Sequence, residues 1–495
     1  MTTESFMKRG QARATRVGGK HICAGLPRNW RAPCSGRWRA ATLTVPPAHG
    51  IAFGMQSVRA LLAKPLAQKA VRNFGWLVVE RIGRLVLGVL VGLVVARYLG
   101  PAELGSLTYA IAMVTLLGFL PELGLDSVLR RELLKTPDRT PALLCTALLL
   151  RLGAGTLAYA GLVGLVALGF GGSSVERRLL LIVGLILFQP AAYLNELWLQ
   201  VQLQAKRGTI VQLGALSVSA CLRLWLVSSG ASVPAFAWVI IGELVLCTAG
   251  YYWAARGLGL RWPLRPADGA TTRWLLTEAW PLMFANLAVI IYLRIDEVML
   301  RYLADAQAVG VYAAAVKLSE LCYFLPTALA ASVLPALLRA REQAPAVYAA
   351  RQQQYYDLSA GVAYLLSVPI ALAAPWIVRL AYGEKFADAA PILSVHIWAS
   401  VFVFLGVARG QWLVNEGLQK FYLAATLSGA VANVLLNCLF IPRWGGLGAA
   451  YATVVSYALA GWLASYCHPA VRVAARAQTL ALLIPLRAWS YLRRR

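Results

Sequence analysis

Ionisable side chains inside long apolar segments are the residues of this sequence that could do chemistry. Measured from the predicted segment ends, Arg84, Arg223, Glu243, Lys317 and Glu320 lie nearest to mid-segment. A charged group at the centre of a bilayer costs roughly 2.5–3.5 kcal/mol on insertion scales, so such groups tend to face a cavity or a partner. Arginine forks and a lysine point charge are well suited to hold a diphosphate. These residue types therefore favour a water-filled, electropositive cavity that binds an anion.

Two sets of candidate site residues follow from this argument. The candidates for binding the anion are basic: Arg81, Arg84, Arg151, Arg223, Arg294 and Lys317. The candidates for coupling transport to a cation gradient are acidic: Asp296, Glu297 and Glu320. We expect no catalytic residue and no cofactor. A metal site is not expected either, because the eight cysteines are scattered without paired spacing.

Structural alternatives exist for most of these charges. Opposite charges three or four residues apart on a helix can neutralise each other, as in Glu80 with Arg84, Arg294 with Glu297, and Lys317 with Glu320. Arg81 and Arg151 have no such partner and can instead extend towards the cytoplasmic face. We also interpret His396 as a hydrogen-bonded interfacial residue, and Asn433 with Asn437 as interhelical packing residues or sugar ligands.

Composition places these charges in a membrane. Of 495 residues, 59% are hydrophobic and 14% are charged, and the mean hydropathy is +0.63. A soluble fold could not bury that much apolar surface, whereas a bilayer core calls for about 20 apolar residues per helix. The net charge of +26 is explained by basic loops that set topology, so it does not indicate nucleic-acid binding.

Twelve apolar segments punctuated by charge, Gly or Pro predict an all-α polytopic membrane protein. They span about 74–97, 106–126, 141–169, 179–200, 208–229, 233–255, 274–300, 308–338, 355–378, 390–412, 417–440 and 446–467. We expect a first six-helix lobe at 70–256, a cytoplasmic linker at 257–273 and a second six-helix lobe at 274–468. A basic interfacial tail is expected at 470–495.

An internal repeat relates the two lobes. Arg97-Tyr98-Leu99, then Gly105, then Phe119-Leu120-Pro121 return about 205 residues later as Arg301-Tyr302-Leu303, Gly310 and Phe324-Leu325-Pro326. Ordered matches at nearly one offset indicate duplication. Since each half holds an even number of helices, the halves should be related by an axis along the membrane normal around a central cavity.

The N-terminal segment 1–54 differs from the rest of the chain. It is basic and Pro-containing and has no apolar run of spanning length or signal-peptide h-region. It is either a disordered basic tail or an artefact of gene calling with Met55 as the start. We expect no ordered structure there, and a chain begun at Met55 should still insert and function.

The short motifs of this sequence resemble those of the polysaccharide transporters, the Wzx-type O-antigen and exopolysaccharide flippases of the MOP superfamily. The resemblance rests on residues 95–101, Gly105, 123–126, Arg130-Arg131, 294–296, 309–312, Ala315, Lys317, 382–386, Ile441-Pro442 and 445–450. It covers about residues 70–468. It implies two MATE-like lobes, and movement of a polyprenyl-diphosphate-linked oligosaccharide across the cell inner membrane for cell-surface polysaccharide or lipopolysaccharide synthesis.

Other functions stay open at this point. A MATE-like multidrug or cation antiporter shares the architecture but would be expected to use acidic residues. A membrane enzyme such as a glycan polymerase or ligase would need a catalytic loop, and the longest outer connection has only about a dozen residues. We therefore expect a non-enzyme whose partners are the lipid-linked glycan, membrane lipids and possible polymerase or export machinery, without nucleic acid.

Loop charges predict the topology of the chain. Alternate loops carry fourteen basic residues, whereas the loops between them carry seven, so the richer set and both termini should lie in the cytoplasm. Reporter fusions at Arg265 and the C-terminus should report cytoplasm, and a fusion at Ala306 should report periplasm. A cytoplasmic signal at Ala306 would overturn the predicted number of helices.

Overall fold

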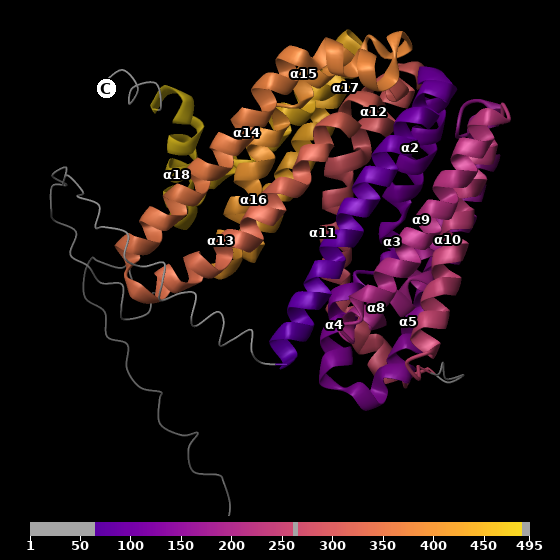
Figure 1. Ribbon diagram of the computed structural model, residues 1–495, viewed down its shortest axis with the longest axis horizontal. Helices are drawn as coiled ribbons and strands as arrows, with labels where there is room; N and C mark the ends of the chain where they lie inside the picture. The colour runs from indigo at the N-terminus through magenta and orange to yellow at the C-terminus, as the bar shows by residue number, and fades with distance from the viewer. Residues whose placement is uncertain (1–64, 261–265, 488–495) are drawn as a thin grey trace, which may run out of the picture. The chain divides into compact units, whose positions relative to one another are not determined.

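The computed structural model describes residues 65–260 and 266–487. Every element assigned in these two ranges is helical. The predicted N-terminal segment 1–54, the linker residues 261–265 and the last residues 488–495 lie outside the described residues. The predicted all-α architecture is confirmed, and its helices are shown in Figure 1.

The first half of the chain forms the elements α2 to α10. Their bounds are α2 Pro65–Leu117, α3 Phe119–Glu122, α4 Leu125–Lys135, η2 Pro137–Arg139, α5 Thr140–Ala167, α6 Ser174–Gly184, η3 Leu185–Phe188, α7 Gln189–Ala192, α8 Leu194–Val201, α9 Ala205–Ser228 and α10 Val233–Arg256.

The second half forms the elements α11 to α18. Their bounds are α11 Gly269–Leu303, α12 Ala306–Glu320, η4 Leu321–Tyr323, α13 Phe324–Gln343, α14 Pro345–Tyr382, η5 Glu384–Phe386, α15 Ala389–His396, α16 Ala399–Asn415, α17 Gln419–Gly461, η6 Leu463–Tyr466, η7 Pro469–Val471 and α18 Arg472–Leu482.

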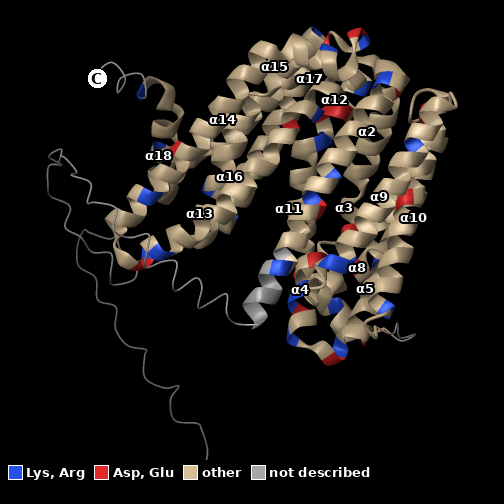
Figure 2. Ribbon diagram, viewed as in Figure 1, with Lys and Arg blue, Asp and Glu red and all other residues tan. Residues whose placement is uncertain are grey.

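Nine stretches of the described residues are long and apolar enough to cross a membrane. The stretch 419–466 contains two limbs, because Gly445 adopts φ 53° in the middle of α17. The helix α2 has two further limbs on either side of Gly100, where φ is 74° and Pro101 begins the next turn. When the two limbs of 419–466 and the two limbs of α2 are counted as separate spans, the described residues contain the twelve predicted segments. In Figure 2, charged residues are sparse along most helices and denser around α4 and the end of α13.

The second predicted segment differs from the structure at its end. It was expected to continue to residue 126, but α2 ends at Leu117 and the chain turns through α3. Leu123 and Gly124 then both take positive φ values, 52° and 64°. Gly124 is required there because an added Cβ would meet the Met283 backbone nitrogen of α11 at 2.6 Å. The predicted helix is interrupted because the chain makes a close backbone contact at this point.

The repeated glycines pack against each other where α2 and α12 cross. A Cβ added to Gly105 would collide with the carbonyl oxygen of Ala306, and one added to Gly310 would collide with that of Pro101. Gly310 is the residue 205 positions after Gly105, and Ala306 is the residue 205 positions after Pro101. Equivalent positions of the two halves therefore meet reciprocally, as around a two-fold axis. We call this contact the outer crossing, because the loop charges predict that it lies at the outer end of the helices.

Two equivalent arginines reinforce the outer crossing from opposite directions. Arg97 of α2 donates from Nε to the Ala381 carbonyl oxygen at 2.8 Å, and also to that of Leu380, near the end of α14. Arg301 of α11 forms two hydrogen bonds of 2.6 and 2.8 Å to the Glu176 carboxylate at the start of α6. Each arginine therefore joins its own half of the chain to the other half.

The long helix α11 packs against both halves. Its first part contributes Leu275 and Ala279 to a hydrophobic core made otherwise of first-half residues, and Glu278 pairs with Arg131 of α4 at 2.9 Å. Its last part packs against α12 and α17 of the second half. The predicted boundary at residue 274 remains a prediction, and the structure adds that α11 links the two lobes physically.

The helix α18 covers the described part of the predicted interfacial tail. It packs against α14, and its buried Gln478 donates to the carbonyl oxygens of Leu405 and Gly461 at 3.1 and 3.0 Å. Val473 and Leu480 stay exposed on its other side. Such an amphipathic helix, buried on one face and apolar on the exposed one, suits a membrane interface.

The outer crossing yields a stability prediction for Gly105. Replacing Gly105 with Ala should force α2 away from α12 and destabilise the fold by about 1–3 kcal/mol, as overpacking does in other cores. The matched control is Gly92→Ala on the same helix, where an added Cβ meets nothing within 4 Å. Thermal unfolding of both purified variants is the measurement. Equal stability of the two variants would show that the crossing is not a tight contact.

Candidate functional site

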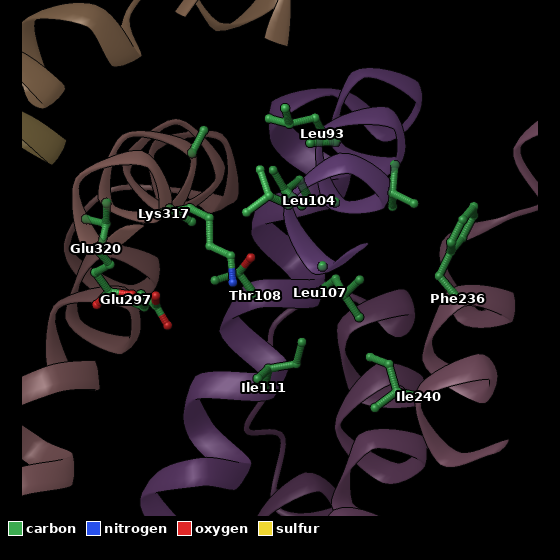
Figure 3. A pocket seen from close by; sticks show the side chains of 18 of the residues that line it. Leu93, Leu104, Leu107, Thr108, Ile111, Phe236, Ile240, Glu297, Lys317 and Glu320 are labelled. Carbon is green, nitrogen blue, oxygen red and sulfur yellow. The ribbon is translucent and has the colours of Figure 1, made fainter. Parts of the chain in front are cut away.

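A central cavity lies between the two halves of the chain, next to the outer crossing. Its volume is about 520 Å³, and its walls come from α2, η3, α7, the α9–α10 pair, α11, α12 with η4, and the end of α14. Figure 3 shows side chains from these elements around the space, including Leu104, Thr108 and Ile240. A cavity walled by both lobes is the arrangement that alternating access requires.

The first half contributes one ion pair to the cavity wall. Arg223 of α9 donates to the Glu243 carboxylate of α10 at 3.1 Å, and both side chains are about four-fifths buried. The sequence suggested no partner for Arg223, because the two residues lie on different helices. Pairing across α9 and α10 lowers the cost of holding both charges at membrane depth.

The second half contributes another pair and two further charges. Arg294 donates to Glu297 at 3.2 Å, three residues along α11, which confirms the predicted helical pair. Lys317 and Glu320 of α12 also line the cavity. Within the described ranges no ion pair of 4 Å or less joins these two, although they are close enough to interact electrostatically.

Lys317 is exposed towards the cavity. In Figure 3 its side chain extends from α12 towards Thr108 and Leu104 of α2, while the carboxyl groups of Glu297 and Glu320 lie on the α11–α12 side. The salt bridges of the described residues do not include Lys317, in contrast to Arg223 and Arg294. Lys317 is therefore the cavity cation that is best placed to meet a ligand.

Three predicted anion-binding residues lie away from the cavity wall. Arg84 pairs with Glu80 at 2.6 Å and is half exposed, and Arg81 is exposed on the same helix. Arg151 is buried in the first half, where it bonds to Asp126 and to the Pro190 carbonyl oxygen. Local and cross-helix acids explain the positions of Arg84 and Arg151. Their predicted substrate contacts have no support in this geometry.

The cavity wall is balanced in formal charge rather than electropositive. Arg223, Arg294 and Lys317 face the three acids Glu243, Glu297 and Glu320. The excess of basic residues expected from the sequence arose because Arg81, Arg84 and Arg151 were counted with them. A ligand anion would therefore find one cation without a partner and two arginines that already hold a carboxylate.

Asp296 occupies a separate, fully enclosed polar cluster in the second half. Its carboxylate accepts from Asn437 Nδ2, Tyr312 Oη and Thr453 Oγ1, each at 2.6 Å. Asn437 also donates to Asn433 Oδ1 on the same helix at 3.2 Å, and its bond to Asp296 of α11 is the interhelical contact expected of an asparagine here. The Asn437 amide oxygen has no partner among the described groups. A buried carboxylate that accepts from one amide and two hydroxyl groups, with no basic partner among the described residues, is suited to a proton or a small hard cation.

Other polar groups of these sites could not be recognised from the sequence. Thr453 and Tyr312 carry no charge, and they approach Asp296 only because α11, α12 and α17 pack together. Glu176 had a detectable signal, since Ser173 and Glu176 form a capping box at the start of α6. That signal predicts a helix end but gives no indication of Arg301.

His396 was interpreted as a hydrogen-bonded interfacial residue. The ring is only 3% exposed, and Nδ1 lies 2.6 Å from Ser319 Oγ of α12. Its position at the membrane interface remains a prediction. The expected hydrogen bond is present, but it is made in the protein interior.

Two solved structures with a similar fold are of transporters. The lipid II flippase MurJ in its inward closed conformation matches with a TM-score of 0.65 and 14% identity, covering 83% of this chain and 92% of that one. An inward-facing multidrug resistance MATE family transporter of the MOP superfamily matches with a TM-score of 0.61 and 14% identity, covering 83% and 96%. The chain is therefore a multi-pass membrane protein with the fold of these transporters.

The chain belongs to the polysaccharide biosynthesis protein family, whose profile matches residues 94–391. It is also similar to the probable flippase AglR of Haloferax volcanii, with 29% identity over 265 residues. That alignment covers 51% of this chain and 52% of AglR, so it spans about half the length of this relative. The predicted family resemblance is confirmed.

Proposed function

We propose that the protein is a flippase that moves a lipid-diphosphate-linked oligosaccharide across the cell inner membrane. The observation that carries the proposal is the cavity between the two lobes, with Lys317 free to meet an anion. Membership of a polysaccharide biosynthesis family supports the substrate class. The names of the similar proteins AglR and MurJ, both flippases, support the type of transport.

The cavity chemistry suits a diphosphate with sugars attached. Lys317 supplies a point charge for a phosphate oxygen, and Arg223 and Arg294 can exchange a carboxylate for a second phosphate oxygen. Thr108, Thr115, Gln189 and Tyr193 also line the wall, and their hydroxyl and amide groups can pair with sugar hydroxyls. The lipid tail remains in the bilayer, where the surrounding hydrocarbon shields it from water without any contact to the protein.

Transport proceeds by alternating access, with the outer crossing closed in the state described here. The bound diphosphate contacts Arg223 of the first half and Lys317 of the second, so it can favour one arrangement of the lobes over the other. A ligand shifts such an equilibrium only through contacts that differ between the states. Rocking of residues 74–255 against 274–467 must be accommodated within α11, because its first part packs against the first half.

Transport is coupled to a cation gradient through the acidic residues of the second half. Asp296 is the principal candidate because its carboxylate is enclosed by oxygen-bearing side chains and lacks a basic partner. Glu297, the next residue in the sequence, and Glu320 of α12 line the cavity, so they could pass the cation between the cavity and Asp296. The protein acts as a transporter and not as an enzyme, needs no cofactor, and has both termini in the cytoplasm. Polymerase or export proteins of the same pathway are its expected partners.

A MATE-like antiporter is the second candidate, and the three cavity acids Glu243, Glu297 and Glu320 favour it. A cationic drug would bind to these carboxylates, whereas a glycan diphosphate needs the basic residues. Loss of drug efflux on neutralising the acids, with glycan export intact, would identify the antiporter.

Charge reversal at Lys317 tests the flippase proposal. Lys317→Ala should lower glycan export about 10-fold and Lys317→Glu more, because a charge-assisted hydrogen bond contributes about 1.5–3 kcal/mol, whereas Lys317→Arg should retain most export. Export of the lipid-linked glycan is followed in cells that lack their own flippase, with protein level measured separately. The control is Lys420→Glu, an exposed residue at the start of α17. Normal export by Lys317→Glu at normal protein level would refute the role of the cavity cation.

Coupling is tested by Asp296→Asn, which keeps the side-chain shape but removes the charge. Glycan transport is measured in membrane vesicles with an imposed Na⁺ or H⁺ gradient. In this variant the transport rate should no longer depend on the gradient. Asp305→Asn is the matched control, because Asn caps the start of α12 about as well as Asp does. Unchanged gradient dependence in Asp296→Asn would exclude Asp296 as the coupling residue.

A further inference from the structure

A second buried arginine, Arg409 of α16, lies outside the central cavity and is used by none of the steps above. Its side chain is within the second half and the residue is only 2% exposed. Nη1 donates to Ser465 Oγ of η6 at 2.7 Å, and the guanidinium lies 6.0 Å from the centre of the Phe421 ring. Nε has no hydrogen-bond partner among the described groups. The guanidinium is therefore enclosed but only partly satisfied.

Arg409 also lacks an acidic partner within 4 Å in the part of the chain that the structure describes. The nearby acids of the same half are engaged by other groups: Glu416 pairs with Arg341 at 3.4 Å, and Asp357 pairs with Arg487 at 3.2 Å. The comparably buried Arg151, by contrast, pairs with Asp126. Removing an ion from water costs several kcal/mol unless an opposite charge compensates, and Arg409 has no such compensation from the protein.

Neighbouring polar groups from α14 are unsatisfied as well. Both amide atoms of Gln352 and the hydroxyl of Tyr356 are buried without a hydrogen-bond partner. These residues lie four apart, so they share a face of α14, and α14 packs against α16. The Tyr356 hydroxyl lies beside the Gln352 amide but does not form a hydrogen bond of good geometry with it, and it is close enough to Arg409 to interact electrostatically. Buried polar groups are nearly always paired, so three adjacent side chains with free atoms require an explanation.

We propose that Arg409, Gln352 and Tyr356 form a binding site for a small inorganic monoanion such as chloride. The guanidinium Nε, the amide Nε2 and the phenol hydroxyl are donors, and the amide Oε1 is the one obligate acceptor, so the set favours a negative ligand. A monoanion compensates the arginine charge, which water cannot do. The groups are too enclosed for a diphosphate, which separates this site from the central cavity. The anion would join α14 to α16 and η6.

Anion-dependent unfolding of the full chain in lipid nanodiscs tests this site. Chloride is replaced by gluconate at constant sodium, so that any effect of Na⁺ stays fixed. The Tm should rise saturably with chloride by about 2–4 °C, as expected for a ligand that binds only the folded state, and bromide should act in the same way. Binding of radioactive chloride should saturate at one ion per chain.

Three variants decide whether the effect belongs to this site. Arg409→Met should abolish the chloride-dependent shift, and Tyr356→Phe, which removes only a hydroxyl, should weaken it even if Arg409→Met does not fold. Arg151→Met is the control, because that arginine is equally buried but already has Asp126, and it should retain the shift. A Tm that is equal in chloride and gluconate would overturn the site, since water would then satisfy these atoms. A chloride-dependent shift that persists in Arg409→Met would place the anion elsewhere and overturn the site. If Arg409→Met does not fold, a full-sized shift in Tyr356→Phe would have the same meaning.

Discussion

The close crossing of α2 and α12 is the contact on which the rest of the structure depends. Two helices approach this closely only where neither has a side chain, and Gly105 and Gly310 supply that condition in both halves. Arg97 and Arg301 add hydrogen bonds between the halves at the same end. The halves are joined there, and the polar space between them lies next to the crossing. The crossing thus defines the closed end of the cavity, and it has to open when the lobes rock to the alternate state.

The cost of charge inside a membrane explains how the remaining ionisable groups are arranged. Most are neutralised by a neighbour, either on the same helix, as in Arg294 with Glu297, or across helices, as in Arg223 with Glu243. Asp296, Lys317 and Arg409 are among the charges that have no ion-pair partner within the described ranges. Charges that the protein leaves uncompensated are the natural positions for ligands. The three residues suggest three different ligands, namely a cation, a diphosphate and a small anion.

The sequence was sufficient for the fold because its signals are local and repeated. Apolar length gives each helix, and the 205-residue repeat predicts two related halves, which the reciprocal contact of Gly105 with Gly310 makes visible. Interruptions were harder to predict: the turn at Leu123 and Gly124 depends on the approach of α11. A twelve-segment pattern cannot reveal such a contact between distant segments.

The site was predicted less completely, and the reason is geometric. Sequence spacing reveals partners on the same helix, so Glu80 with Arg84 could be foreseen, but Asp126 for Arg151 and Glu176 for Arg301 could not. Of the six basic candidates, those that line the cavity are Arg223, Arg294 and Lys317. The direction in which each side chain points depends on the packing of neighbouring helices, which sequence spacing does not give.

The central claim is that the outer crossing opens during transport, and a distance between the lobes tests it most directly. Spin labels are placed at Val175 and Leu303, which are exposed beside the Glu176–Arg301 pair, in a variant without native cysteines. Double electron–electron resonance in nanodiscs should show a short and a longer distance between the labels. Arg301→Gln should increase the population of the longer distance. A label pair at Val175 and Ser229, both in the first half, should not change. A single short distance that Arg301→Gln leaves unaltered would contradict alternating access through this end of the molecule.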